Sequence, residues 1–130
     1  MSLTVSALRG SSNGRAQVDH RLARRALINE YRRGRLRQDQ VCDAHPELIR
    51  AAKNVGTAVE LPCPICDEHG LRLVTYVFGP RLPAQGRCVS TAKELSMLNR
   101  RREELSAYVV EACVECQWHH LRSVLPVGGR

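Results

Sequence analysis

The sequence predicts an α+β fold, in which an N-terminal helical unit of two to three short helices precedes an antiparallel β unit with an inserted helix. Three observations predict it. Apolar residues recur at helical spacing before residue 56, strands rich in β-branched residues follow, and two CxxC tetrapeptides lie at strand junctions of this second part. A chain of 130 residues is long enough for one ordinary domain or two very small ones.

The N-terminal part divides into a tail and a basic helical unit. Residues 1–17 are rich in Ser, Gly and Asn without periodicity, and we expect a flexible tail. In the helical unit, residues 18–56, Asp19 can cap a first helix that stops at Gly34. Its apolar side chains form one stripe, and the arginines are expected to point away from it: Leu22, Ala23, Ala26, Leu27 and Tyr31.

Two shorter helices complete this unit. Asp39 can cap a second helix, which Pro46 interrupts because proline disfavours helical geometry in the residue before it. A third helix begins at Pro46 and stops at Gly56. Its expected inward residues are Leu48, Ile49 and Ala52.

The β unit spans residues 57–130. "LRLVTYVFGP" reads as a strand, "AYVVEAC" as a strand running into the second CxxC, and "QWHHLRSVLPV" as a strand running out of it. Between them, Thr91 and Glu94 match a capping box, and the spacing of Leu95, Leu98 and Leu105 predicts a helix over residues 91–105.

Two CxxC pairs give the second part its chemistry: Cys63, Cys66, Cys113 and Cys116. In a zinc ribbon, two CxxC turns at the mouths of hairpins supply four thiolates at tetrahedral angles. Four protein ligands close the coordination sphere, so we expect one structural Zn²⁺ rather than a catalytic one. The β unit is therefore predicted to be a zinc-ribbon unit with helix 91–105 inserted between its two knuckles.

Other interpretations of these cysteines stay open. The pairs could be free core thiols or redox dithiols, and His69, His119 or His120 could replace one sulfur. Knuckles often place Gly after the second Cys, where Asp67 and Gln117 stand here. The two remaining thiols are expected to be buried and nearly apolar: Cys42 and Cys88.

The net charge of +7 favours an anionic partner. Arginine dominates, and its planar fork of donors suits phosphate and carboxylate. Residues 15–37 hold eight arginines against two acidic residues, a local charge of +6. The candidate partner-binding residues form this cluster and a second one further along: Arg21, Arg24, Arg25, Arg32, Arg33, Arg35, Arg37, Arg100, Arg101 and Arg102. A solvated helix face is the alternative.

The sequence contains no catalytic motif. It has no Gly-rich phosphate loop and no GxSxG, "DEHG" reads as a solvated hairpin turn, and His119 and His120 point to opposite faces of a strand. We therefore predict no enzyme and no small-molecule substrate. With no run of about 18 apolar residues and no signal-peptide core, we expect no membrane contact and a cytoplasmic location.

Four stretches resemble a small actinobacterial protein family of unknown function: "VDHRLARRALINEYRRGRLRQDQVCDAHPELIRAAKNVG", "CPIC", "LRLVTYVFG" and "YVVEACVECQWHHL". The likeness covers about residues 18–127. It implies an actinobacterial, cytosolic protein with a four-cysteine zinc ribbon, and it brings no assigned activity. In that family a Gly follows the second CxxC, so Gln117 is a departure.

Three classes of function follow. The leading hypothesis is a non-catalytic accessory protein that binds a nucleic-acid machine, RNA polymerase or the ribosome, through the basic helix and the ribbon. Aromatic residues near the strands could stack on bases, fill a partner's pocket or form the ribbon's own core: Tyr76, Phe78, Tyr108 and Trp118. The alternatives are a direct DNA-binding regulator with a helix-turn-helix across "YRRGRLRQDQ" and a zinc- or redox-responsive thiol regulator.

Overall fold

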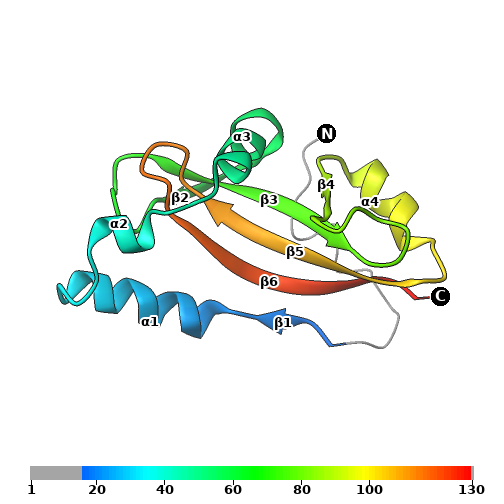
Figure 1. Ribbon diagram of the computed structural model, residues 1–130, viewed down its shortest axis with the longest axis horizontal. Coiled ribbons are helices and arrows are strands. Elements are labelled where there is room, and N and C mark those ends of the chain that lie inside the picture. Colours follow the sequence, from blue (N-terminus) through cyan, green and yellow to red (C-terminus); the bar gives the residue numbers. More distant parts are fainter. Residues whose placement is uncertain (1–15, 130) are drawn as a thin grey trace.

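The computed structural model of the protein describes residues 16–129, so most of the tail predicted over residues 1–17 lies outside the described part. The described chain is α+β, with four helices and a six-stranded antiparallel sheet (Figure 1). The elements are β1 (Val18–Asp19), α1 (Arg21–Arg32), α2 (Gln38–Val41), α3 (Pro46–Val55), β2 (Thr57–Pro62), β3 (Gly70–Phe78), β4 (Arg87–Val89), α4 (Ala92–Asn99), β5 (Glu104–Ala112) and β6 (His119–Gly128). None of these helices combines the length and hydropathy needed to cross a membrane.

The sheet is built around three long strands. Its order is β1-β6-β5-β3-β2, and β4 pairs with β3 as well, beyond the end of β2. A β-bulge interrupts the β5–β6 ladder where Val109 pairs with Ser123 and Val110 with Leu121, which leaves Arg122 as the extra residue. Because β1 comes from the predicted helical unit, the N-terminal part contributes a strand to the same sheet.

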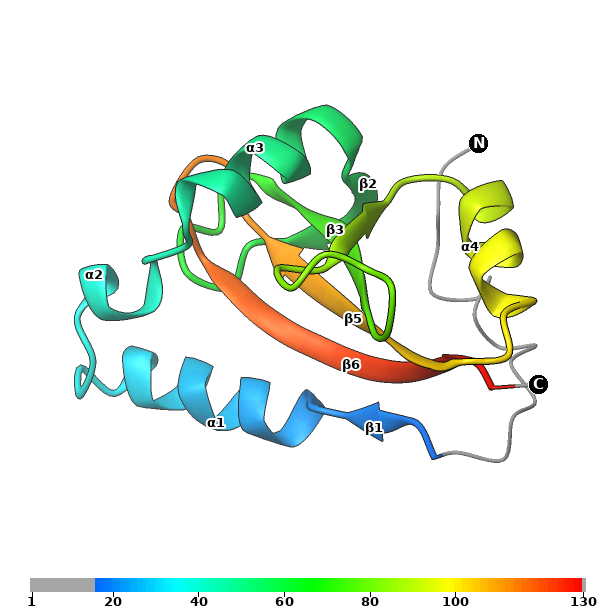
Figure 2. The same cartoon turned by 45° about the vertical axis from the view of Figure 1, so that its right-hand side comes forward.

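The two faces of the sheet bury different helices. On one face, Leu105, Ala107 and Val109 of β5 are buried in a cluster that includes Leu95 and Leu98 of α4. On the other face, α3 packs Ala52 against Val74 and Ala112, and Figure 2 shows α3 over the strands near the end where the cysteine turns lie. The alternation of β5 thus separates two packing layers, with α4 and α3 at opposite ends of the sheet.

Helix α1 ends as predicted and begins one residue later than an Asp19 cap would give, with His20 as its N-cap. Its buried face is rotated from the predicted stripe and shares Leu27 and Tyr31 with it. Leu22, expected on the buried stripe, has 81% of its surface exposed, whereas Ile28 is buried. The inward face is instead the one that carries Arg24, Leu27, Ile28 and Tyr31, at spacings of three and four residues. The helix ends as predicted, because Gly34 adopts a φ of 76° and its N–H donates to the Tyr31 carbonyl.

The inserted helix is shorter than predicted. Thr91 caps it and accepts a hydrogen bond from the Glu94 N–H, but α4 ends at Asn99, and Leu105 belongs to β5. Gly129 stabilises the turn between α4 and β5, since its N–H donates to the carbonyls of Arg101 and Glu103. The prediction of a helix to residue 105 was wrong because Leu105 fits a helical spacing and the inward face of a strand equally well.

Candidate metal centre

Each CxxC pair forms a turn that two backbone hydrogen bonds of the first Cys close, in a similar pattern. In the first, Asp67 N–H donates to the Cys63 carbonyl (2.9 Å) and Cys63 N–H to the His69 carbonyl (2.8 Å). In the second, Gln117 N–H donates to the Cys113 carbonyl (3.0 Å) and Cys113 N–H to the Trp118 carbonyl (2.9 Å). The turns lie between β2 and β3 and between β5 and β6, at one end of the sheet. They are the two knuckles that the sequence predicts.

The knuckles bring four sulfurs together. The Sγ atoms of Cys63, Cys66, Cys113 and Cys116 all lie within 4.8 Å of one another. Two contacts join the knuckles, at 3.5 Å from Cys63 to Cys116 and 3.8 Å from Cys66 to Cys113. A tetrahedral ion with sulfur ligands at about 2.3 Å needs sulfurs about 3.8 Å apart. The donor set therefore fits one soft, four-coordinate metal ion.

Backbone conformation after each pair is that of a ribbon knuckle. Asp67 has a φ of 58° and Gln117 a φ of 72°, both in the left-handed region. An L residue there costs about 1–2 kcal/mol, which is why Gly is common at this position. The second knuckle thus adopts the required geometry in spite of Gln117.

Gln117→Gly is expected to stabilise the protein by up to about 1 kcal/mol, because Gly relieves the left-handed strain and keeps both backbone hydrogen bonds of residue 117. The free energy of unfolding from urea denaturation of the metal-loaded protein measures this. Glu115→Gly is the matched control: Glu115 is an exposed residue of the same knuckle without a positive φ, so this change should destabilise. A loss of stability in both variants would contradict the assignment of strain.

Burial sets the protonation of the sulfurs. Burial raises the pKa of Cys63 far above its ordinary range and raises the pKa of Cys116 to about 12. Burial also acts to raise the pKa of Cys66, but backbone N–H groups of Glu68 and His69 outweigh it, and the pKa is lowered. Without metal, Cys63 and Cys116 therefore keep their protons at neutral pH, so metal binding releases protons and tightens as pH rises.

The histidines stay outside the cluster in the described chain. His69 Nε2 lies 4.0 Å from Glu68 Oε2, and His119 Nε2 lies 2.9 Å from Asp43 Oδ1. His120 stacks on Trp118 with ring centroids 6.0 Å apart, and burial lowers the pKa of His120. The interpretation of a histidine as one metal ligand is not supported by this arrangement.

The two remaining cysteines differ in position. Cys88 is half-buried on β4 and faces Tyr76 of β3 in the ladder, as a near-apolar thiol would. Cys42, by contrast, lies with its Sγ 3.5 Å from Cys116 Sγ. The prediction of a buried, nearly apolar thiol did not place Cys42 beside the metal centre, because no spacing motif links residue 42 to the CxxC pairs.

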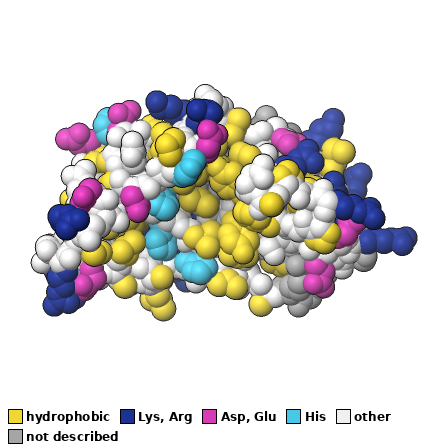
Figure 3. Space-filling model, viewed as in Figure 1, with side chains coloured by type: hydrophobic (Ala, Val, Ile, Leu, Met, Phe, Trp, Pro, Cys, Tyr) yellow, Lys and Arg dark blue, Asp and Glu magenta, His cyan; other side chains and the backbone are white. Residues whose placement is uncertain are grey.

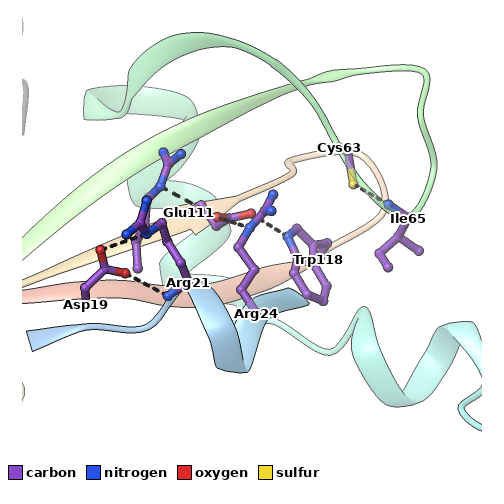
Figure 4. Close-up of polar contacts among 8 residues, drawn as sticks. Asp19, Arg21, Arg24, Cys63, Ile65, Glu111 and Trp118 are labelled. Atoms are coloured by element: carbon purple, nitrogen blue, oxygen red, sulfur yellow. Dashed lines mark hydrogen bonds and ion pairs between the residues drawn. The ribbon is translucent and has the colours of Figure 1, made fainter. Parts of the chain in front are cut away.

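A buried carboxylate lies beside the metal centre (Figure 4). Glu111 of β5 is fully buried and accepts from Arg24 Nε (2.6 Å) and Trp118 Nε1 (2.8 Å), with Arg122 Nε 3.9 Å away. This contact ties α1 to the strand that leads into the second knuckle. The expectation that the arginines of α1 all point outward is therefore wrong for Arg24, whose side chain is only 25% exposed. A buried carboxylate requires a cation, and that requirement sets the rotation of the helix.

Arginines from α1 and β6 surround a hollow of about 330 Å³ against the first knuckle. Its lining includes Arg21, Arg24, Arg25, Arg32 and Arg122, with Pro64 from the CPIC turn. Among the described residues, Arg25 and Arg32 form no ion pair, whereas Arg21 pairs with Asp19. Two other candidates, Arg33 and Arg35, lie within 3.6 Å and 3.2 Å of Glu30, and Arg37 lies 3.0 Å from Asp39. The cluster of Arg100, Arg101 and Arg102 follows α4, at the opposite end of the sheet (Figures 1 and 2).

The four aromatic residues on or near the strands of the β unit separate into one buried ring and three half-buried rings. Trp118 is fully buried. Tyr76, Phe78 and Tyr108 line a groove of about 1050 Å³ on the face that carries α3. Figure 3 shows this face, with apolar side chains across its centre, histidines beside them and basic side chains towards its rim. No lysine or arginine of the described chain lines the groove.

The fold and the site define an α+β protein with a four-cysteine cluster that is compatible with a zinc-ribbon-like unit. Residues 11–129 match the profile of a family of unknown function, DUF5318. The chain belongs to this family, which confirms the resemblance stated from the sequence.

Relatives come from mycobacteria. Uncharacterised proteins of Mycobacterium tuberculosis and Mycobacterium bovis are each 44% identical to the chain over 104 residues, which is 80% of this chain and 76% of the relative. No solved structure shows significant similarity.

Proposed function

We propose that the protein is a non-catalytic zinc-ribbon accessory protein that binds a nucleic-acid machine, RNA polymerase or the ribosome, in the cytoplasm. The observation that carries the proposal is the arginine-lined hollow beside the first knuckle. It places a concentration of positive charge next to a rigid, metal-stapled turn, as a docking site for an anionic macromolecule requires.

Zinc is the metal we propose, and its role is structural. Four thiolates at these distances suit Zn²⁺, and they leave no ligand position for a reacting water. We therefore propose no catalytic role for the metal. The metal would hold β2, β3, β5 and β6 together at one end of the sheet.

The arginine hollow and the aromatic groove would bind different parts of the partner. Phosphate or carboxylate would bind at the arginine hollow, where Arg25 and Arg32 have no competing acidic partner in the described chain. The aromatic groove has no basic lining residue among those described, so it suits apolar protein side chains better than nucleic acid. Together these surfaces favour a ribonucleoprotein or a polymerase over naked nucleic acid.

Direct DNA reading by a helix-turn-helix has less support. The second helix of that motif would be α2, which has four residues and reaches the buried core through Val41. A recognition helix needs several exposed side chains along the major groove. The thiol-regulator alternative is favoured by one observation, the contact between Cys42 and Cys116.

Replacing both Arg25 and Arg32 with Gln should weaken binding to the machine and leave folding nearly unchanged, since both side chains are exposed and unpaired in the described chain. The slope of log affinity against log salt should flatten by about 0.7–0.9 for each phosphate that the variant no longer neutralises. Arg100→Gln with Arg102→Gln is the matched control with the same charge change at the other end of the sheet.

The partner is captured from native lysate with tagged wild-type protein and both double variants, with and without nuclease. Capture of polymerase subunits that persists after nuclease treatment would identify RNA polymerase. Capture of ribosomal proteins that is lost together with the rRNA would identify the ribosome. Equal capture by wild type and the Arg25/Arg32 variant at every salt concentration would contradict a role for the hollow.

A further inference from the structure

A fifth sulfur lies at the metal centre. Cys42 Sγ is 3.5 Å from Cys116 Sγ, the same distance that separates Cys116 Sγ from Cys63 Sγ. The set of mutually close sulfurs contains the four knuckle cysteines and not Cys42. Cys42 therefore lies outside the tetrahedron, next to the Cys116 corner.

The backbone around Cys42 is fixed to the second knuckle by two further contacts. Ala44 N–H donates to the Gln117 carbonyl (3.1 Å), and the Asp43 carboxylate lies 2.9 Å from His119 Nε2. Residues 42, 43 and 44 thus each contact a residue of the segment 116–119. This docking holds the backbone of Cys42 beside the second knuckle.

Cys42 is more accessible than the two fully buried knuckle cysteines. It follows the last residue of α2, a helix of four residues, and both Cys42 and Cys116 are half-buried, whereas Cys63 and Cys113 are fully buried. A rotation of the Cys42 side chain could carry the sulfur inward without displacing the docked segment or the sheet. Zn²⁺ imposes no geometric preference of its own that would oppose an exchange of one thiolate for another.

We propose that Cys42 is a reserve ligand of the metal centre, which takes the place of Cys116. The inference rests on the metal centre of the proposed function. In the exchange, Cys42 loses its thiol proton to the departing Cys116 sulfur across their contact, so that one thiolate replaces another and the charge of the centre is unchanged. The centre can then lose the Cys116 sulfur, for example to an electrophile, and still hold its metal.

The four knuckle cysteines should consequently differ in how much metal affinity is lost when each is replaced. Purified protein is titrated with Co²⁺ as the probe, because its visible and sulfur-to-metal charge-transfer bands report the number of thiolate ligands. The variants are Cys116→Ser and Cys66→Ser, each with and without Cys42→Ser. Cys66 is the matched cysteine, since it is the second Cys of the other knuckle and has no contact with Cys42 among the described residues.

The Cys116→Ser protein is expected to bind one Co²⁺ with a four-thiolate spectrum. Adding Cys42→Ser should weaken binding at least about tenfold, because losing a direct ligand costs at least as much as losing an outer-shell partner. Adding Cys42→Ser to Cys66→Ser should change neither spectrum nor affinity. Identical spectra and affinities for Cys116→Ser with and without Cys42 would overturn the inference. Wild-type protein without a four-thiolate spectrum would overturn the proposed metal centre itself.

A second measurement needs no ligand variant. Zinc-loaded wild type is treated with iodoacetamide, and alkylated cysteines are mapped by mass spectrometry. Exchange predicts that Cys42 and Cys116 are both modified while Cys63, Cys66 and Cys113 are protected. Protection of Cys116 equal to that of Cys113 would contradict the exchange.

Discussion

Cys113→Ser is expected to release the metal and unfold the sheet at the knuckle end. Cys113 is fully buried, and its sulfur lies 3.8 Å from Cys66 of the other knuckle. Cys42 adjoins a different corner and cannot replace it. Structural zinc contributes about 10–16 kcal/mol of binding free energy in small domains. The free energy of unfolding of a folded domain is only about 5–15 kcal/mol, so a variant that loses most of the metal's contribution is expected to unfold at this end.

Metal content measures the release of the metal, and amide hydrogen exchange measures the unfolding of the sheet. Strands β3, β5 and β6 should lose protection next to the knuckles in Cys113→Ser. Cys88→Ser is the control, because Cys88 is half-buried on β4 and lies outside the cysteine cluster of the described chain. A Cys113→Ser protein that keeps one metal ion and wild-type protection would refute a structural metal centre on these cysteines.

Arg24→Gln should destabilise the protein by about 3–5 kcal/mol, the range for removing one partner of a buried ion pair. The change leaves the fully buried Glu111 carboxylate with Trp118 Nε1 at 2.8 Å and Arg122 Nε at 3.9 Å. Because Arg122 supplies a second positive charge at a longer distance, the loss of stability should lie near the lower end of this range. Urea denaturation of the metal-loaded protein measures it.

Arg25→Gln, one residue along the same helix, should change the free energy of unfolding by no more than about 0.5 kcal/mol, since Arg25 is exposed. Combining Arg24→Gln with Glu111→Gln should recover most of the loss, because the buried charge is then removed together with its partner. If Arg24→Gln were as stable as Arg25→Gln, the Arg24–Glu111 contact would not anchor α1.

The parts of the fold that local chemistry specifies could be predicted from the sequence. Pro46 and Gly56 bound α3, Thr91 caps α4, and Gly34 ends α1 through a positive φ. The CxxC pairs likewise predict their own clustering, because each spacing forms a complete two-ligand turn and the strands place the two turns together.

Apart from the length of α4, where local spacing was ambiguous, the errors concern long-range contacts. The stripe of α1 has the predicted period but a different rotation, because Glu111 across the sheet takes Arg24 as its partner. The signal was present in the sequence: Glu111 continues the alternation of Leu105, Ala107 and Val109, which predicts a buried carboxylate in need of a cation. Its partner could not be predicted, since several arginines were available.

Cys42 shows the limit of motif spacing. It stands outside any ligand pattern, and its contact with Cys116 depends on how the segment 42–44 docks on the second knuckle. Such docking involves a backbone hydrogen bond and a side-chain hydrogen bond between residues more than 70 positions apart, for which the sequence has no local signature.

Elemental analysis of freshly purified, untagged protein tests the presence of a structural metal most directly. We expect one zinc ion per chain in wild type and in Cys88→Ser, and none retained by Cys113→Ser after desalting. Wild-type protein that is folded, has all its cysteines reduced and contains no zinc or other metal ion would contradict a structural metal centre on Cys63, Cys66, Cys113 and Cys116.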